Sequence, residues 1–159
     1  MIQTKITALL DQHQVSYRVL PHQKPVFTIA EAAAQRGVVR EEMVKSILLR
    51  EGKRDRFVMA CLLGDARLDP KAVRTYLDED WRRLTFATAE DILTITGYTQ
   101  GAVAPLCLPE EVPVIFDEAI ADCDNVNISS GDLMAGLELK GTDLIRLAGA
   151  VLGNIVRAE

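Results

Sequence analysis

Lys45 is the residue whose surroundings in the sequence point most directly to chemistry. It lies in the segment 43–49, MVKSILL, whose β-branched and apolar composition predicts a strand. Alternate side chains of a strand point to opposite faces, so Lys45 shares a face with Ile47 and Leu49, and both faces are mostly apolar. Because a buried ammonium is costly, Lys45 either keeps its amine in water at a strand edge or projects into a cleft. In a cleft it can hold a phosphate or polarise a carbonyl.

A second candidate is the segment 96–105, TGYTQGAVAP. Gly101 can adopt backbone angles that other residues resist and allows close approach of a ligand. Ala102 and Ala104 leave the backbone amides unshielded, and Pro105 stiffens the end of the loop. Such a loop can present N–H donors to a carbonyl oxygen, or it can simply connect a helix to a strand.

Two further segments carry candidate binding residues. Ser129, Ser130 and Gly131 follow an expected strand, where they can bind a ligand or cap a turn. His22 and Phe27 lie in an expected loop, where binding residues often occur. A single histidine in a loop is also a common surface residue, so both interpretations stay open.

Composition limits the protein class. The chain has 159 residues, 48% hydrophobic and 26% charged, which predicts one globular domain and excludes a disordered or collagen-like chain. No apolar run reaches the ~18–20 residues that span a membrane. The three cysteines, Cys61, Cys107 and Cys123, form no CxxC motif, and there are only two histidines. We therefore expect reduced thiols, a cytoplasmic protein, and neither a metal site nor a cofactor.

Charge is distributed unevenly along the chain. Residues 1–80 carry 13 Lys and Arg against 11 Asp and Glu, whereas residues 81–159 carry 5 against 12, which together give the net charge of -5. An acidic total argues against non-specific binding to DNA. It leaves room for a local contact between the first half and a polyanion.

Periodicity and capping signals predict the elements that must position these residues. Helices are expected over 2–14, 28–36, 69–76, 88–96 and 142–147. Strands are expected over 15–20, 44–50, 56–63, 112–116, 125–129 and 151–156, with a hairpin turn at 52–55 and a loop over 97–108 that merges into a strand. The strand at 112–116 is expected to start at a sheet edge, because it contains a proline. The pattern predicts a single compact α+β domain with a mixed, mainly antiparallel sheet flanked by helices, over residues 1–159.

Four segments occur in a particular order along the chain. They are HQKPVFTIAEA at 22–32, VKSILL at 44–49, TGYTQGAVAP at 96–105 and ISSG at 128–131. In this order and spacing the chain resembles the YbaK/prolyl-tRNA synthetase-associated family of aminoacyl-tRNA editing domains, which includes free-standing deacylases. The resemblance covers nearly the whole chain.

The resemblance implies hydrolysis of the ester that joins a wrong amino acid to its tRNA. It places the catalytic roles on Lys45, which would anchor the phosphate or ribose of the terminal nucleotide, and on Gly101, whose loop would offer amides to the ester carbonyl. A positioned water attacks, with help from the substrate's ribose hydroxyl, and no protein nucleophile is needed because the ester is already activated. The expected substrate-binding residues are His22, Phe27, Ala102, Pro105, Ser129, Ser130 and Gly131.

The expected partner is the 3′ end of an aminoacyl-tRNA, and a tRNA synthetase is a further one; neither DNA nor a membrane is expected. Phe27 would wall the pocket or stack on the adenine. Arg50, Lys53, Arg54 and Arg56 surround the hairpin turn and would contact the acceptor stem, unless they form only a solvated turn. Cysteine or alanine on proline tRNA are the family's expected substrates.

The chain departs from the family pattern at two places. Many relatives have a Gly-Gly-x-Ser-Pro loop, whereas here Ala102 and Ala104 replace the second glycine and the serine. Asp132 and Leu133 stand where relatives often carry basic residues. Because these changes shrink the pocket and weaken anion binding, two other functions remain open: a non-catalytic module that binds tRNA or an aminoacyl ligand, and a protein-interaction domain unrelated to tRNA.

Overall fold

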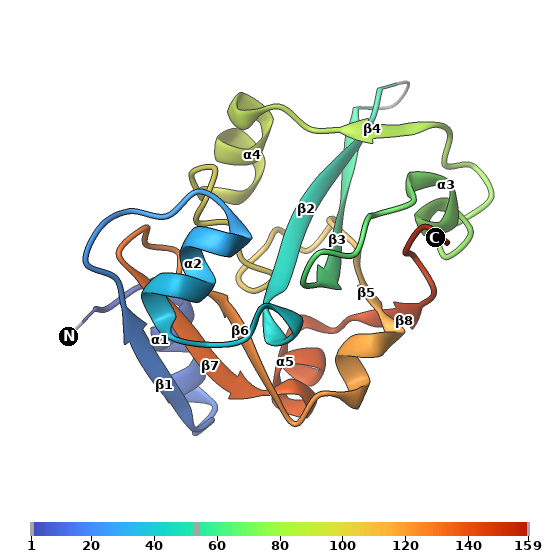
Figure 1. The fold of residues 1–159 in the computed structure, drawn as a ribbon. Coiled ribbons are helices and arrows are strands. Elements are labelled where there is room, and N and C mark those ends of the chain that lie inside the picture. Colours follow the sequence, from blue (N-terminus) through green and yellow to red (C-terminus); the bar gives the residue numbers. More distant parts are fainter. Residues whose placement is uncertain (1, 53–54, 159) are drawn as a thin grey trace.

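Two β-sheets and five α-helices make up the α+β fold (Figure 1). The computed structural model describes residues 2–52 and 55–158. The α-helices are α1 (Lys5–Gln12), α2 (Ile29–Arg36), α3 (Pro70–Arg74), α4 (Ala89–Thr96) and α5 (Gly141–Ala148), with short 3-10 helices η1 (Arg40–Glu42) and η2 (Glu118–Asp122). The strands are β1 (Tyr17–Pro21), β2 (Val44–Glu51), β3 (Arg56–Leu63), β4 (Leu84–Phe86), β5 (Val114–Asp117), β6 (Asn125–Ser129), β7 (Ala135–Lys140) and β8 (Val151–Gly153).

The five-stranded sheet has the order β4-β2-β3-β5-β8. Strands β2 and β3 form the predicted antiparallel hairpin, while β3–β5 and β5–β8 pair in parallel. Strand β4 pairs only with the last three residues of β2, Leu49–Glu51, and one further hydrogen bond joins the Ala87 amide to the Leu48 carbonyl. The edge of β2 at residues 44–47 is therefore not covered by β4.

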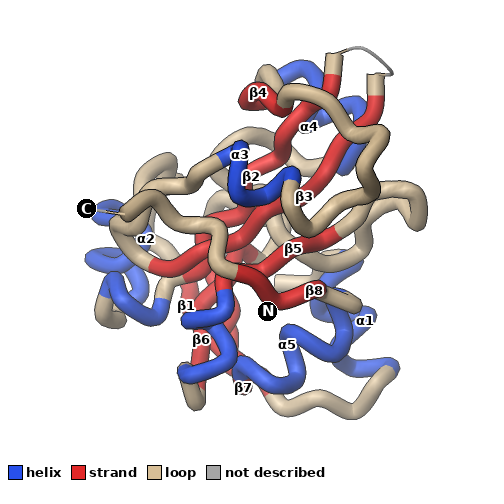
Figure 2. Tube along the Cα trace, turned by 90° about the vertical axis from the view of Figure 1, so that its right-hand side faces the viewer, coloured by secondary structure: helices blue, strands red, loops and turns tan. Residues whose placement is uncertain are grey.

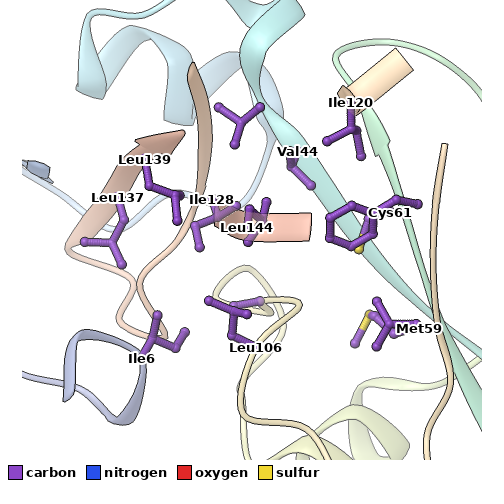
Figure 3. Close-up of a cluster of buried hydrophobic side chains, with 14 of the residues drawn as sticks. Ile6, Val44, Met59, Cys61, Leu106, Ile120, Ile128, Leu137, Leu139 and Leu144 are labelled. Carbon is purple, nitrogen blue, oxygen red and sulfur yellow. The ribbon is translucent and has the colours of Figure 1, made fainter. Parts of the chain in front are cut away.

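The three-stranded antiparallel sheet has the order β1-β7-β6 and lies beside the first. Helices α1 and α5 cover one face and α2 covers the other, as the side view in Figure 2 shows. The face covered by α1 and α5 forms the main core, where Ile6 and Leu144 meet Ile128 and Leu137 (Figure 3). No helix in the described part of the chain is both long and apolar enough to cross a membrane.

Capping residues set the helix boundaries much as the sequence predicts. Thr28 accepts a hydrogen bond from the Glu31 amide, and Gly37 ends α2 in a left-handed conformation. Thr88 forms a full capping box with Asp91, and Asp69 with Pro70 begins α3. These predictions are confirmed, because a side-chain oxygen that satisfies a free helix amide is encoded locally.

Other boundaries and pairings differ from the predictions. Helix α1 begins after Thr4, which caps it, and α3 ends at Arg74. Strand β5 begins at Val114 and lies between β3 and β8, so the expected edge position is wrong. Segment 97–108 remains a loop throughout, and strands β4 and β7 were not predicted. The strands also divide into two sheets rather than one.

Helix α2 is anchored to the three-stranded sheet through Arg36. The Arg36 side chain lies over Gly136 of β7 so closely that a Cβ added at Gly136 would lie 2.0 Å from Arg36 Nε. Arg36 Nε donates to Nε2 of the buried His22 ring at 3.0 Å, and His22 Nδ1 lies 2.8 Å from the Leu133 carbonyl oxygen. The absence of a side chain at Gly136 therefore sets how closely α2 approaches the sheet.

We expect Gly136→Ala to lower the free energy of unfolding by about 1–3 kcal/mol, because the new methyl group would displace the Arg36 side chain. Urea denaturation measures the change. Gly52→Ala is the matched control: its Cβ would meet nothing within 4 Å, and its backbone is not left-handed. The control should leave stability within about 1 kcal/mol of wild type. Equal stabilities of the two variants would contradict this packing argument.

Candidate functional site

A pocket of about 390 Å³ lies where the edge of β2 is left open. Helix α2, the end of β4, helix α4 and the loop at 97–105 surround it. The charged and polar groups in its lining are Thr28, Arg36, Lys45, Ser46, Gln100 and Ser129. Among the described residues, aspartate and glutamate do not occur in this lining, so the pocket carries positive charge from Arg36 and Lys45.

Four predicted site residues line this pocket together. They are Phe27, Lys45, Gly101 and Ser129, which come from four separate segments of the sequence. Phe27 is 64% exposed although it is a large apolar residue. An exposed aromatic ring at the rim of a charged pocket is suited to contact with a planar ligand group.

Lys45 projects from the face of β2 that it shares with Ile47 and Leu49. Its ammonium group donates a hydrogen bond to the carbonyl oxygen of Ala66, in the segment that follows β3. Partial burial lowers the pKa of Lys45, and the nearby Asp65 carboxylate opposes that change. Lys45 therefore lines the pocket, while its ammonium is held by a neutral acceptor that lines a neighbouring hollow.

Gly101 adopts a φ of 93°, in the left-handed region that favours glycine. A Cβ at this position would lie 3.1 Å from both Leu133 Cδ2 and the Val26 carbonyl oxygen, and 3.2 Å from Phe27 Cδ1. The loop thus approaches the Phe27 segment so closely that a methyl group at this position would push its neighbours aside. This contact joins two of the predicted site segments.

The other predicted binding residues do not line the pocket. His22, Ala102 and Pro105 are buried beside it. Both ring nitrogens of His22 are already engaged, since Nε2 accepts from Arg36 and Nδ1–H donates to the Leu133 carbonyl. That arrangement requires a neutral ring, and burial lowers the pKa of His22 accordingly. His22 supports the site through Arg36.

The late serine motif forms a turn. Ser130 is fully buried, and its hydroxyl donates to the Ala135 carbonyl at 2.7 Å and accepts from the Asp132 amide at 3.2 Å. Gly131, with a φ of 89°, packs against the Tyr98 ring. Ser129 accepts from the Gly131 amide at 3.2 Å, and it alone of the three lines the pocket.

Two residues in the pocket were not identified from the sequence. Arg36 lies on the pocket face of α2, seven residues after Ile29 and four after Ala32, and forms no ion pair with a carboxylate of the described residues. Burial lowers the pKa of Arg36 to about 10. Phe86, at the end of β4, is 61% exposed. The helical spacing of Arg36 from Ile29 and Ala32 could have indicated that it faces the pocket. Phe86 lies in a strand of only three residues, which gives no comparable signal in the sequence.

The structure explains the loop positions at which the chain departs from the family pattern. Ala102 and Ala104 are 1% and 0% exposed, so both methyl groups pack into the interior rather than the pocket. Leu133 packs against Gly101, and Asp132 is exposed with its carboxylate accepting from the Met134 amide. These substitutions therefore alter the wall behind the pocket more than its lining.

Both described cations of the predicted stem contact, Arg50 and Arg56, are paired with carboxylates. Arg50 contacts Asp55 at 2.8 Å, and both side chains are exposed. Arg56 contacts the buried Glu51 at 3.0 Å and Asp80 at 3.4 Å, with its guanidinium 4.0 Å from the centre of the Trp81 ring. Lys53 and Arg54 lie outside the described residues.

The described residues offer little support for a catalytic nucleophile or a bound metal ion. None of their histidine, cysteine, aspartate and glutamate side chains form a group of three that could hold a metal ion. Cys61 is fully buried, and burial raises the pKa of its thiol to about 12. Cys107 and Cys123 do not line the pocket, and burial raises the pKa of each thiol. The pocket can bind and polarise an oxygen-rich ligand but offers no activated thiolate.

Comparison with known proteins agrees with this geometry. Residues 23–147 match the family model of the aminoacyl-tRNA editing domain. The proline–tRNA ligase of Kosmotoga olearia is 32% identical over 121 residues, which cover 76% of this chain but only 20% of that enzyme. The chain thus spans about a fifth of that relative's length.

Two solved structures share the fold. Hypothetical protein APE2540 superimposes with a TM-score of 0.86 at 27% identity, covering 97% of this chain and all of the other. A candidate trans-editing enzyme for prolyl tRNA synthetase superimposes with a TM-score of 0.80 at 21% identity, covering 99% of this chain and all of the other. The family match, the fold and the placement of the four motifs lead to one conclusion: this chain belongs to the aminoacyl-tRNA editing domain family.

Proposed function

We propose that this protein is a deacylase that hydrolyses the ester bond of mischarged aminoacyl-tRNA. The observation that carries the proposal is the pocket itself, in which Lys45, Arg36 and the Gly101 loop surround a space that no carboxylate of residues 2–52 and 55–158 lines. Such a pocket suits the 3′ end of an aminoacyl-tRNA, which combines phosphates, ribose hydroxyls and an ester carbonyl. Membership of the editing family supports the same ligand.

The proposed mechanism needs only binding and polarisation. Lys45 anchors the phosphate or ribose of the terminal nucleotide, while backbone amides of the Gly101 loop stabilise the oxyanion that forms as water attacks the carbonyl. The neighbouring ribose hydroxyl assists the water. The attack forms a bond between the water oxygen and the carbonyl carbon. The bond between the carbonyl carbon and the ribose oxygen then breaks, and the ribose oxygen leaves with a proton from the water. Because the ester is already activated, positioning supplies much of the rate.

The proposed substrates are small amino acids on proline tRNA, with alanine and cysteine first. Support comes from the modest pocket volume and from relatives that are proline–tRNA ligases. A synthetic site cannot strongly reject a side chain smaller than its own substrate, so a second hydrolytic site is useful. We place this activity in the cytoplasm, where tRNA is charged.

A second candidate is a binding module that retains the fold without turnover. Asp132 favours it, because a carboxylate stands where relatives often have a cation. Saturable binding of charged tRNA with no release of any amino acid would support this alternative. Release of one amino acid would exclude it.

We expect Lys45→Ala to reduce kcat/KM for the preferred mischarged tRNA by roughly a hundredfold to a thousandfold, because one preorganised charge is lost from the site. The measurement is release of alanine, cysteine or proline from proline tRNA. The control is Lys140→Ala, which removes an exposed lysine at the end of β7, outside the pocket lining. A Lys45→Ala variant that is folded and fully active would contradict the proposed role of this lysine.

We expect Gly101→Ala to raise KM and to lower stability by about 1–2 kcal/mol, because alanine resists a left-handed φ and its methyl group would press on Phe27 and Leu133. Gly149→Ala is the matched control: φ is 60°, but nothing lies within 4 Å of its Cβ. Gly149→Ala should therefore lose no more stability than Gly101→Ala, and only Gly101→Ala should change KM. A KM that is unchanged by Gly101→Ala would show that the loop does not contact the substrate.

A further inference from the structure

A path of hollows continues from the pocket toward α3. The pocket shares Lys45, Ile47 and Phe86 with a second hollow of about 270 Å³, which is also lined by Arg67 and Arg157. Arg157 in turn lines a third hollow, of about 690 Å³. Because each hollow shares lining residues with the next, the three adjoin one another in series from α2 past β2 to α3, and we call this series the depression; these elements follow one another across the view in Figure 1.

The part of this depression beyond the pocket is strongly basic. It is lined by five exposed cations, which we call the basic groove: Arg67, Lys71, Arg74, Arg83 and Arg157. Across residues 2–52 and 55–158, none of these five forms an ion pair with a carboxylate. Their concentration on one surface is notable in a chain whose net charge is -5.

Carboxylates near the basic groove are engaged elsewhere or lie at its end. Asp65 pairs with Arg40, and Asp69 accepts a hydrogen bond from the Lys71 amide as the cap of α3. Asp78 and Glu79 line a fourth hollow, which shares Lys71 and Arg74 with the third. The basic side chains therefore lie between Lys45 and α3, and acidic side chains adjoin them at the α3 end.

The C-terminal segment is fixed by hydrogen bonds where the second and third hollows meet at Arg157. The Arg157 amide donates to the Arg67 carbonyl at 2.7 Å, and Arg157 Nε donates to the Leu68 carbonyl at 3.2 Å. The Asp69 amide donates to the Ile155 carbonyl at 2.8 Å. The Arg157 guanidinium is thus preorganised by a hydrogen bond to the backbone, which lowers the entropy that a bound ligand must remove.

We propose, resting on the deacylase function above, that the basic groove binds the phosphates of the tRNA acceptor stem. The unpaired 3′ nucleotides then pass over the exposed Phe86 ring into the pocket, since unpaired bases stack readily on aromatic side chains. The β2–β3 hairpin suits this role less well. Its described cations Arg50 and Arg56 already pair with carboxylates, which compete with phosphate.

The test measures binding of two fluorescent RNA probes by anisotropy over a range of salt concentrations. One probe is an uncharged acceptor-stem minihelix of proline tRNA ending in CCA, and the other is a single strand with the same 3′ end. We expect Arg74→Ala with Arg83→Ala to weaken minihelix binding roughly tenfold or more at 0.1 M salt and to reduce the salt slope by about two. Binding of the single strand should change little.

Two control variants separate the groove from its neighbours. Arg50→Ala removes an exposed but paired hairpin cation and should leave minihelix binding within about twofold of wild type, as expected for a cation outside the interface. Phe86→Ala should weaken both probes, because it acts on the unpaired nucleotides that the probes share. Unchanged minihelix affinity and salt slope in the double variant would overturn the proposal, as would a loss with Arg50→Ala as large as with the double variant.

The probes also keep this proposal distinct from the deacylase function. Neither probe carries an amino acid, so binding is measured without turnover. If wild type releases no amino acid from any charged tRNA but the double variant still loses minihelix affinity, the groove is supported and the deacylase function fails. If wild type deacylates and the minihelix does not bind, the groove assignment is wrong while the deacylase function stands.

Discussion

The partly buried ammonium group of Lys45 is the constraint on which the rest of the site depends. A lysine on an apolar strand is tolerated only if its charge has an acceptor and an opening to water. The Ala66 carbonyl supplies the acceptor, and the short β4, which pairs only with Leu49–Glu51, supplies the opening. The same uncovered edge of β2 forms the floor of the pocket. The short β4 therefore accounts both for the pocket and for the position of the Lys45 charge.

The walls of the pocket are held by close contacts that are possible only because two positions are glycine. Gly136 lets Arg36 lie flat on the three-stranded sheet, and Gly101 lets its loop touch the Phe27 segment. His22 fixes the Arg36 guanidinium through a neutral ring whose other nitrogen is bound to Leu133. Both walls of the pocket are thereby tied to the same turn after β6, through the Leu133 carbonyl and the Leu133 side chain.

The sequence could predict the elements whose signals are local, and it failed where the cause is tertiary. Hairpin β2–β3, strand β6 and the capped helices α2 and α4 follow from alternation and capping residues. Strand β4 has three residues, and β7 begins with Ala-Gly, so neither shows a clear strand signal. Four motif residues meet in the pocket. Arg36 could have been found from its helical spacing, whereas Phe86 could not be identified, because its exposure depends on packing between segments distant in sequence.

The most direct test of this account is an experimental structure with a non-hydrolysable analogue of the 3′ end, in which an amide replaces the ester between alanine and adenosine. The account predicts that the analogue occupies the pocket between α2 and β2, with its carbonyl against the Gly101 loop, its ribose or phosphate beside Lys45 and its adenine against an exposed phenylalanine. An analogue bound elsewhere, or bound in the pocket without contact to Lys45 and the Gly101 loop, would contradict it.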